Sequence, residues 1–230
     1  MLETVFLDAG GVLVYPNWTR ISQALAARGV IVDPVALARA EPHAKKRIDV
    51  PQTIKATNDA GRGWMYFNLI FEYAGVPPAP EIDEALQELY AYHQTSNLWE
   101  LVPSAVAPAL AALRNRGLKL TIVSNANGKL RVLFDRLALS ECVDCLLDSH
   151  DEGVEKPDPR FFDIALERSG ARRETTIHVG DLYQVDVMGA QAAGLRGVLL
   201  DEAGLYPDVT CPRVRSLPEL VTLISSGAFD

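Results

Sequence analysis

One short stretch near the N-terminus, TVFLDAGGVLV at residues 4–14, constrains the fold of this chain more than any other feature. Its apolar run Val5–Leu7 predicts a buried strand, which ends at one carboxylate, Asp8. Gly10 and Gly11 follow, and glycine lets the backbone approach a ligand closely. Ligands of α/β proteins bind outside the carboxyl ends of the parallel strands. We therefore interpret Asp8 as a chemically active side chain, a nucleophile, at the edge of such a sheet.

The bulk composition of the 230 residues is that of a globular protein, with 48% apolar and 23% charged residues. No apolar run approaches the roughly 18 residues of a membrane span, and no secretory signal is expected. The three cysteines show no disulfide spacing, which favours reduced thiols and a cytoplasmic location. The net charge of −8 argues against a nucleic-acid partner. It does not exclude a phosphorylated small substrate, because amides, a lysine and a metal ion can reverse the charge inside one pocket.

The segment between residues 16 and 98 has helical patterns and no convincing strand alternation. Helices are expected from near Trp18 to Gly29 and over Asp33–Lys46, Trp64–Ala74 and Glu81–His93, with Asp33 as an N-cap. Pro51 is expected to interrupt the helical pattern. The Pro-rich Val76–Pro80 predicts a turn between two of the helices, and Gly61 and Gly63 suggest a mobile or tightly turned segment. About eighty residues are too many for a loop, so 16–98 is predicted to be a helical cap domain.

From Val102 onward, strands alternate with helices of about ten to fifteen residues, which predicts a parallel sheet covered on both faces. Strands are expected at Lys119–Val123, Val143–Leu147, Thr175–Val179 and Arg196–Leu200. Helices are expected at Ser104–Arg116, Lys129–Leu137, Pro159–Ser169, Gln184–Ala193 and Pro218–Ser225. The predicted fold is a doubly wound α/β core (residues 1–15 and 99–230, Rossmann-like) that carries the inserted helical cap (16–98).

Polar residues follow the predicted strands at several places. Asp8, Ser124 and Asp181 each come directly after a strand, and Lys156 lies in the loop after another. Each has an ordinary alternative: a helix N-cap for either aspartate, a turn for Ser124-Asn125, a solvated charge for Lys156. Because parallel strands end at one edge of a sheet, we expect all four side chains to converge there.

These motifs resemble those of the haloacid dehalogenase (HAD) superfamily. The matching segments are FLDAGGVL at Phe6–Leu13, IVSNANG at Ile122–Gly128, EKPDPRFF at Glu155–Phe162 and HVGDLYQVD at His178–Asp186. They occur in the order of the family and span the whole predicted core, and the insertion occupies the position of a type-1 helical cap.

The resemblance implies a role for each of these residues. Asp8 would attack phosphorus and form an aspartyl-phosphate, and Lys156 would neutralise phosphate charge and keep Asp8 ionised. Ser124 would donate its hydroxyl to a phosphate oxygen, helped by the Asn125 backbone N–H. The remaining implied contacts are a phosphate ligand at Gly11, Mg²⁺ ligands at Asp8, Asp181 and the Gly10 carbonyl, and Asp186 as a carboxylate that completes and braces the metal site.

One position departs from the family pattern. Phosphatases of the family usually carry a second aspartate two residues after the nucleophile, as a general acid and base, and this chain has Gly10 there. The backbone carbonyl is still present for a metal, but a rate contribution of about 10²–10⁴ is missing.

Three functions therefore remain open. The chain could be a phosphatase with another acid or a substrate whose leaving group departs unaided. It could hydrolyse carbon–halogen bonds, although the family's dehalogenases have Tyr in place of Gly10 and lack the carboxylate of Asp181. It could also bind a phosphorylated ligand or partner with little turnover. We expect a Mg²⁺-dependent phosphatase of small phosphorylated metabolites, monomeric or homodimeric, with no nucleic-acid or membrane partner.

The predicted cap would close over the site and select the substrate. Each of its candidate contact residues also has an ordinary structural interpretation, either in a solvated helix face or in the core of the cap. They are Trp18, His43, Lys45, Lys46, Arg47, Arg62, Trp64 and Tyr66. His178, in the strand before Asp181, is interpreted as a satisfied core residue.

Overall fold

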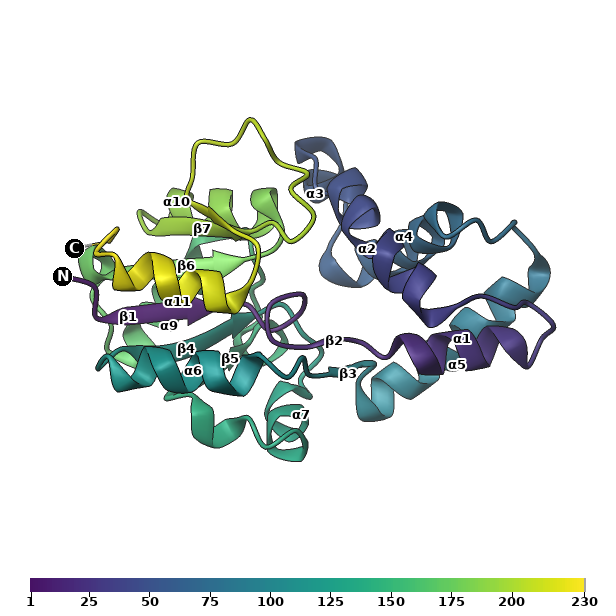
Figure 1. The fold of residues 1–230 in the computed structure, drawn as a ribbon, viewed down its shortest axis with the longest axis horizontal. Coiled ribbons are helices and arrows are strands. Elements are labelled where there is room, and N and C mark those ends of the chain that lie inside the picture. Colours follow the sequence, from purple (N-terminus) through teal and green to yellow (C-terminus); the bar gives the residue numbers. More distant parts are fainter. Residues whose placement is uncertain (230) are drawn as a thin grey trace. The chain divides into compact units, whose positions relative to one another are not determined.

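The computed structural model describes residues 1–229, except for the side chain of Ala60. The chain forms two compact units (Figure 1). Each unit contains a cluster of buried apolar side chains. One, here called the core unit, consists of Met1–Tyr15 and the chain from Val102 onward. The other, the cap unit, is Pro16–Leu101.

The core unit contains a six-stranded sheet whose neighbouring strands are all parallel, in the order β5-β4-β1-β6-β7-β8. The strands are β1 (Thr4–Leu7), β4 (Lys119–Ser124), β5 (Cys145–Asp148), β6 (Thr176–Gly180), β7 (Arg196–Leu200) and β8 (Arg213–Val214). The doubly wound α/β core predicted from the sequence is confirmed. The two-residue β8 was not predicted.

The register of the sheet aligns the ends of its central strands. Phe6 of β1 pairs with Thr121 of β4 on one side and with His178 of β6 on the other. One residue further on, Leu7 pairs with Ile122 and Val179. Asp8 therefore leaves the middle of the sheet at the edge where β4 and β6 also end.

Four helices of the core unit pack in two pairs, α6 with α11 and α9 with α10, and contact strands of the sheet. The α-helices are α6 (Val106–Asn115), α7 (Leu130–Arg136), α8 (Ser149–Glu152), α9 (Pro159–Ser169), α10 (Met188–Ala192) and α11 (Leu217–Ser225). Short helical turns lie at Ser140–Cys142, Arg173–Thr175 and Tyr183–Val187. The last is a π-helical turn where the sequence predicted the start of a regular helix, and such turns are rare and frequent at functional sites.

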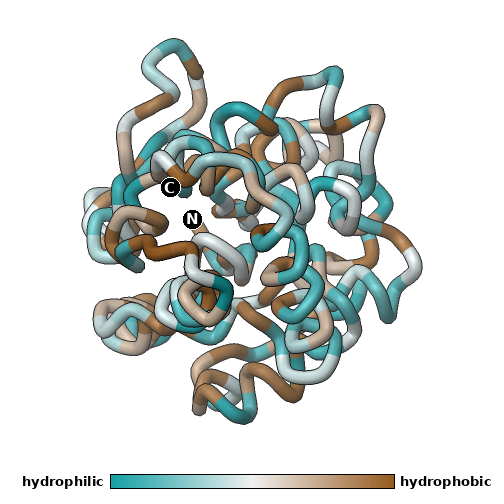
Figure 2. Tube along the Cα trace, turned by 90° about the vertical axis from the view of Figure 1, so that its right-hand side faces the viewer, coloured by the Kyte–Doolittle hydropathy of each residue, from teal (hydrophilic) through white to brown (hydrophobic). Residues whose placement is uncertain are grey.

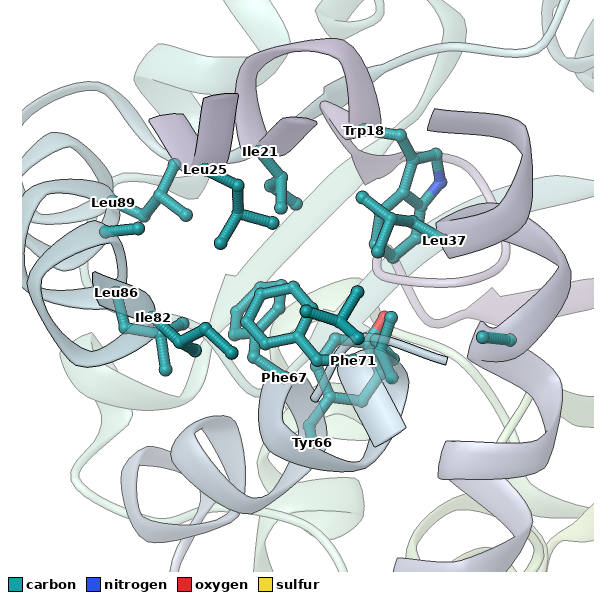
Figure 3. Packing of buried hydrophobic residues seen from close by; sticks show 14 of the residues in the cluster. Trp18, Ile21, Leu25, Leu37, Tyr66, Phe67, Phe71, Ile82, Leu86 and Leu89 are labelled. Atoms are coloured by element: carbon teal, nitrogen blue, oxygen red, sulfur yellow. The ribbon is translucent and has the colours of Figure 1, made fainter. Parts of the chain in front are cut away.

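The cap unit consists of helices around one apolar cluster (Figure 3). They are α1 (Trp18–Ala26), α2 (Pro34–Ile48), α3 (Pro51–Ala56), α4 (Asp59–Tyr73) and α5 (Pro80–Ser96). Trp18, Phe67 and Phe71 are among the buried side chains of the cluster. The Asp33 side chain accepts the Val35 N–H at the start of α2, so the expected N-cap is confirmed.

Two short strands pair where the chain enters and leaves the cap unit. β2 (Tyr15–Pro16) pairs with β3 (Trp99–Leu101), and the Asn17 N–H donates to the Leu98 carbonyl over 2.9 Å. The Glu100 carboxylate accepts from Asn17 Nδ2 at 2.9 Å, from Arg20 Nε at 3.3 Å and from the Tyr92 hydroxyl at 2.9 Å. These contacts hold the two connections side by side.

Two expectations for this segment were wrong. Gly61 and Gly63 lie inside α4 rather than in a mobile segment, because Asn58 caps the helix by accepting the Gly61 N–H and the helix packs along α2. Pro51 does not interrupt helical structure but begins α3, since proline is tolerated in the first turn of a helix.

Apolar and polar stretches alternate along the chain (Figure 2), as expected of elements with one buried face. Within the described residues, no helix combines the length and the apolar character that a membrane crossing requires.

Candidate active site

Asp8 is the residue of the site that directly follows β1. Its Oδ1 accepts the Ala9 N–H at 2.8 Å and lies 3.0 Å from the Lys156 ammonium. Both contacts involve Oδ1. No other described residue forms a hydrogen bond or ion pair with Oδ2, so this oxygen is available for chemistry. The side chain is 14% exposed, so it is held in place and still accessible.

Lys156 is the buried cation of the site. Its Nζ bridges Asp8 Oδ1 at 3.0 Å and Asp186 Oδ1 at 2.7 Å, and only 1% of the side chain is exposed. Burial alone would lower the pKa of this ammonium, but the two carboxylates raise the pKa above its ordinary value. Lys156 is therefore a permanent positive charge beside Asp8, and the alternative of a solvated surface charge is wrong.

Asp186 is fully buried and is held on both carboxylate oxygens. Oδ1 contacts Lys156 Nζ and lies 3.0 Å from His178 Nε2, while Oδ2 accepts the Leu182 N–H at 3.0 Å. Burial opposes ionisation, but the Lys156 charge and the His178 hydrogen bond outweigh it and lower the pKa of Asp186. Asp186 is thus a carboxylate anion that orients Lys156.

A backbone feature makes room for this carboxylate. A Cβ atom added to Gly180 would lie 2.0 Å from the Asp186 Cγ, far inside contact distance. Only glycine at the end of β6 lets Asp186 pack directly on the strand, and Asp181 follows immediately.

Three carboxylates meet at this edge of the sheet. One oxygen from each of Asp8, Asp181 and Asp186 lies within 4.8 Å of the others. Carboxylate oxygens are the ligands that Mg²⁺ prefers, so the donor set fits this ion. Because Asp186 already accepts three hydrogen bonds, Asp8 and Asp181 are the better candidates for direct ligation, with Asp186 as the brace.

The loop after β4 contains Ser124 and Asn125. Ser124 is the last, buried residue of the strand. The Asn125 side chain accepts the Lys156 N–H at 2.8 Å and donates to the Lys156 carbonyl at 2.9 Å. This amide joins the two loops and fixes the base of the lysine, a contact that the sequence did not reveal.

Asp148, at the end of β5, fixes the same loop from the other side. Its Oδ2 accepts the Gly128 N–H at 2.9 Å and the Leu130 N–H at 3.3 Å, and its Oδ1 accepts the His150 N–H at 3.0 Å. Sequence reasoning did not find this residue either. Its place directly after an apolar strand, like that of Asp8, was the signal available.

Gly11 contributes to the loop rather than facing a ligand. Its φ of +72° favours glycine, its N–H donates to the Val14 carbonyl at 2.9 Å, and its carbonyl accepts the Tyr15 hydroxyl at 3.0 Å. With its N–H used in this way, Gly11 is a poor candidate for the expected phosphate contact. The backbones of Gly10 and Val14 form an isolated parallel β-bridge in the same turn.

The cap residues singled out from the sequence differ in their exposure. Trp18, Arg62 and Tyr66 are buried within the cap unit, with Arg62 only 4% exposed. Trp64 is 40% exposed and stacks on Tyr90. Exposed helix positions account for the others, His43, Lys46 and Arg47, while Lys45 pairs with the buried Glu41 at 2.7 Å.

The family of the chain follows from a comparison with known proteins. The model of the haloacid dehalogenase-like hydrolases matches residues 2–194, so the chain belongs to this hydrolase family. The haloacid dehalogenase-like hydrolase domain-containing protein 3 of Mus musculus is 31% identical over 86% of this chain and 81% of that protein. The ribulose-1,5-bisphosphate 5-phosphatase of Halopiger xanaduensis is 31% identical over 70% of this chain and 67% of that protein.

Solved structures show the same fold. The HAD-hydrolase YfnB of Bacillus subtilis, bound to magnesium, has a TM-score of 0.69 at 18% identity and covers 97% of this chain and 98% of its own. A 2-haloacid dehalogenase from Pseudomonas syringae has a TM-score of 0.61 at 24% identity and covers 99% of this chain and 100% of its own. These likenesses show the fold alone, so the chemistry has to be argued from the site.

Proposed function

We propose that this hydrolase is a phosphatase that cleaves small phosphorylated metabolites through an aspartyl-phosphate on Asp8. The observation that carries the proposal is the position of Asp8, whose Oδ1 is held by Lys156 while Oδ2 remains available. In the first step, Oδ2 forms a bond to phosphorus and the bond from phosphorus to the ester oxygen breaks. In the second, water attacks the aspartyl-phosphate and releases inorganic phosphate and the Asp8 carboxylate.

The buried charges around Asp8 suit this reaction. A carboxylate that approaches a phosphate dianion is repelled, and the Lys156 ammonium beside it offsets that repulsion. Ser124 and the Asn125 N–H, at the end of the neighbouring strand, would donate to the phosphate oxygens. Asp186 holds Lys156 in place for this role.

The carboxylate cluster supports a magnesium site in the same place. Asp8, Asp181 and the Gly10 carbonyl would hold the ion, which when bound neutralises phosphate charge in the transition state. The carboxylate of Asp181 is also the feature that favours phosphate over carbon–halogen substrates. A cytoplasmic location and a monomeric or homodimeric state remain predictions from the sequence.

Gly10 shapes the expected substrate range. Without a side chain at this position, no carboxyl group two residues after Asp8 can protonate the leaving oxygen. We therefore expect aryl and acyl phosphates to be cleaved about 10²- to 10⁴-fold faster than alkyl phosphates, because their leaving groups need little protonation. The variant Gly10→Asp should narrow this gap in measured kcat values. Equal rates on both classes in the unmodified protein would show that another residue supplies the proton.

The proposed function is tested with p-nitrophenyl phosphate, with and without Mg²⁺, on the wild type and on Asp8→Asn. The amide is a poor nucleophile, so we expect a loss on the order of 10⁴-fold or more, and no turnover without the metal. Asp208→Asn, which changes an exposed carboxylate of the core unit, is the matched control and should retain full activity.

Each other result identifies an alternative. Halide release from 2-haloacids without metal, lost in Asp8→Asn, would indicate a dehalogenase. Absence of both activities would indicate a protein that binds a phosphorylated ligand with little turnover.

A further inference from the structure

His178 is a polar residue in the most buried layer of the core unit. It lies in the middle of β6, between the buried residues Ile177 and Val179, and none of its surface is exposed. Its ring packs edge-on against Phe162, with centroids 5.0 Å apart. An imidazole in this apolar setting is costly unless its ring nitrogens are hydrogen-bonded.

The hydrogen bonds of this imidazole are unequal. Nε2 lies 3.0 Å from Asp186 Oδ1, whereas Nδ1 has no hydrogen-bond partner among the described residues. An ionised carboxylate can only accept a hydrogen bond, so this contact requires a proton on Nε2. Burial also lowers the pKa of His178. The ring thus leaves one buried nitrogen unsatisfied and donates to Asp186 with the other.

Through this contact, His178 is connected to Lys156 by way of the Asp186 carboxylate. The oxygen of Asp186 that accepts from His178 is the same oxygen that lies 2.7 Å from Lys156 Nζ. Lys156 in turn contacts Asp8 at 3.0 Å. A continuous row of contacts therefore runs from the buried ring to the nucleophile.

We propose that His178 is a positioning residue of the active site, whose Nε2–H holds the Asp186 carboxylate and thereby fixes the Lys156 ammonium beside Asp8. The role in catalysis rests on the proposed phosphatase function. Without this donor, Asp186 keeps Lys156 and the Leu182 N–H but loses the contact that restrains its Oδ1 from the sheet side. Supporting residues of this kind typically contribute about 10- to 100-fold to activity.

The register of the sheet supplies a matched control. Thr121 and His178 occupy the same row, one on each side of Phe6, and both are fully buried. The Thr121 hydroxyl also has no hydrogen-bond partner among the described residues. Thr121→Val therefore makes a similar polar-to-apolar change at the same depth, without contact to Asp186.

The experiment compares His178→Leu, His178→Gln and Thr121→Val by kcat and KM with p-nitrophenyl phosphate. We expect His178→Leu to lower kcat about 10- to 100-fold with KM changed less than threefold, because the site stays assembled but loses its alignment. His178→Gln carries an amide N–H near the place of Nε2. If His178→Leu lowers kcat a hundredfold, His178→Gln should lower it no more than tenfold. Thr121→Val should stay within twofold of the wild type. A folded His178→Gln no better than His178→Leu, or an equal loss in Thr121→Val, would overturn the proposal.

A second measurement does not depend on activity. The chain has four histidines, and ¹⁵N NMR of the side chains, assigned by the loss of one signal in His178→Gln, reports which ring nitrogen carries the proton. We expect a proton on Nε2 at pH 7 and ring signals that shift in Asp186→Asn. An Nε2 without a proton would overturn the arrangement itself. An inactive wild type with the expected NMR signals would instead contradict the phosphatase proposal and leave the His178–Asp186 contact established.

Discussion

The two units of this protein bury charged side chains in different ways. In the core unit, Asp8, Lys156 and Asp186 come from three distant segments and meet within 3.0 Å of one ammonium. In the cap unit, two of the buried charged residues, Glu41 and Arg62, pair within single helices. Glu41 contacts Lys45 four residues later on α2. Arg62 contacts Asp59, three residues earlier on α4.

This difference separates charges assembled from distant strand ends from charges paired along one helix. A pair on adjacent turns forms whenever the helix forms, and its energetic contribution is modest. A cluster assembled from separate strand ends forms only with the complete sheet, and it brings two carboxylates into contact with one lysine in a buried place. Such an arrangement has a cost that a local pair avoids, and it is typical of functional sites.

The largest expected effect comes from removing, in each unit, the lysine that pairs with a buried carboxylate. Lys156→Met leaves two carboxylates beside each other without their cation, and we expect the free energy of unfolding to fall by about 3–5 kcal/mol. Lys45→Met leaves Glu41 with the Tyr66 hydroxyl at 2.6 Å, and about 1–2 kcal/mol is expected. Urea unfolding of both variants measures the two values. Equal losses would show that the local pair is as demanding as the assembled cluster.

A smaller effect is expected from adding one methyl group to a glycine of each unit. Gly180→Ala forces Asp186 away from the strand, since the new atom would lie 2.0 Å from its Cγ, and a cost of about 1–3 kcal/mol is expected. Gly63→Ala lies in α4 with no atom within 4 Å of the new group, and a gain of about 0.5–1 kcal/mol is expected. Thermal unfolding with a fixed buffer checks both signs. Destabilisation by Gly63→Ala would contradict the open surroundings of that helix position.

A third expected effect is the pH dependence of stability through one histidine in each unit. Burial lowers the pKa of His178 in the core unit and of His93 in the cap unit. Below the unfolded pKa of about 6.5, the unfolded chain binds protons that the folded chain resists, so stability falls as pH falls. Each histidine contributes a slope of at most about 1.4 kcal/mol per pH unit.

Urea midpoints of the wild type between pH 7 and 5, set against His178→Gln and His93→Gln, measure these slopes. Both variants should show a flatter decline than the wild type, and His178→Gln the flatter of the two, because that ring is fully buried. A steeper decline in either variant would contradict the lowered pKa of the histidine it replaces.

Much of the fold could be predicted because its signals are local. The strands are buried apolar runs with clear ends, and the N-cap at Asp33 marks the start of α2. The failures are also local in origin. Pro51 is typical of a helix break, yet it begins α3. Gly61 and Gly63 are typical of a turn or a mobile segment, yet packing keeps them in α4. The strand β8 is too short to show a period.

The candidate site could be predicted only in outline. The rule that parallel strands end at one edge identified Asp8, Lys156 and Asp181 as neighbours. It says nothing of the contacts between side chains, which depend on register and rotamer. The Asn125 amide reaches a backbone 31 residues away, and the His178 ring meets Asp186 only because Gly180 lets that carboxylate pack on the strand. No pattern in a single sequence encodes these contacts.

The paired strands β2 and β3 have a consequence for protein engineering. Because the chain enters and leaves the helical insertion through two hydrogen-bonded neighbours, the insertion is attached like a cassette. Its ends are joined by the Asn17–Leu98 hydrogen bond and by the Glu100 contacts, all of which belong to the insertion itself. A different helical insert with the same paired ends could therefore replace it without altering any strand of the parallel sheet, and chimaeras spliced at this junction would test whether the insertion selects the substrate.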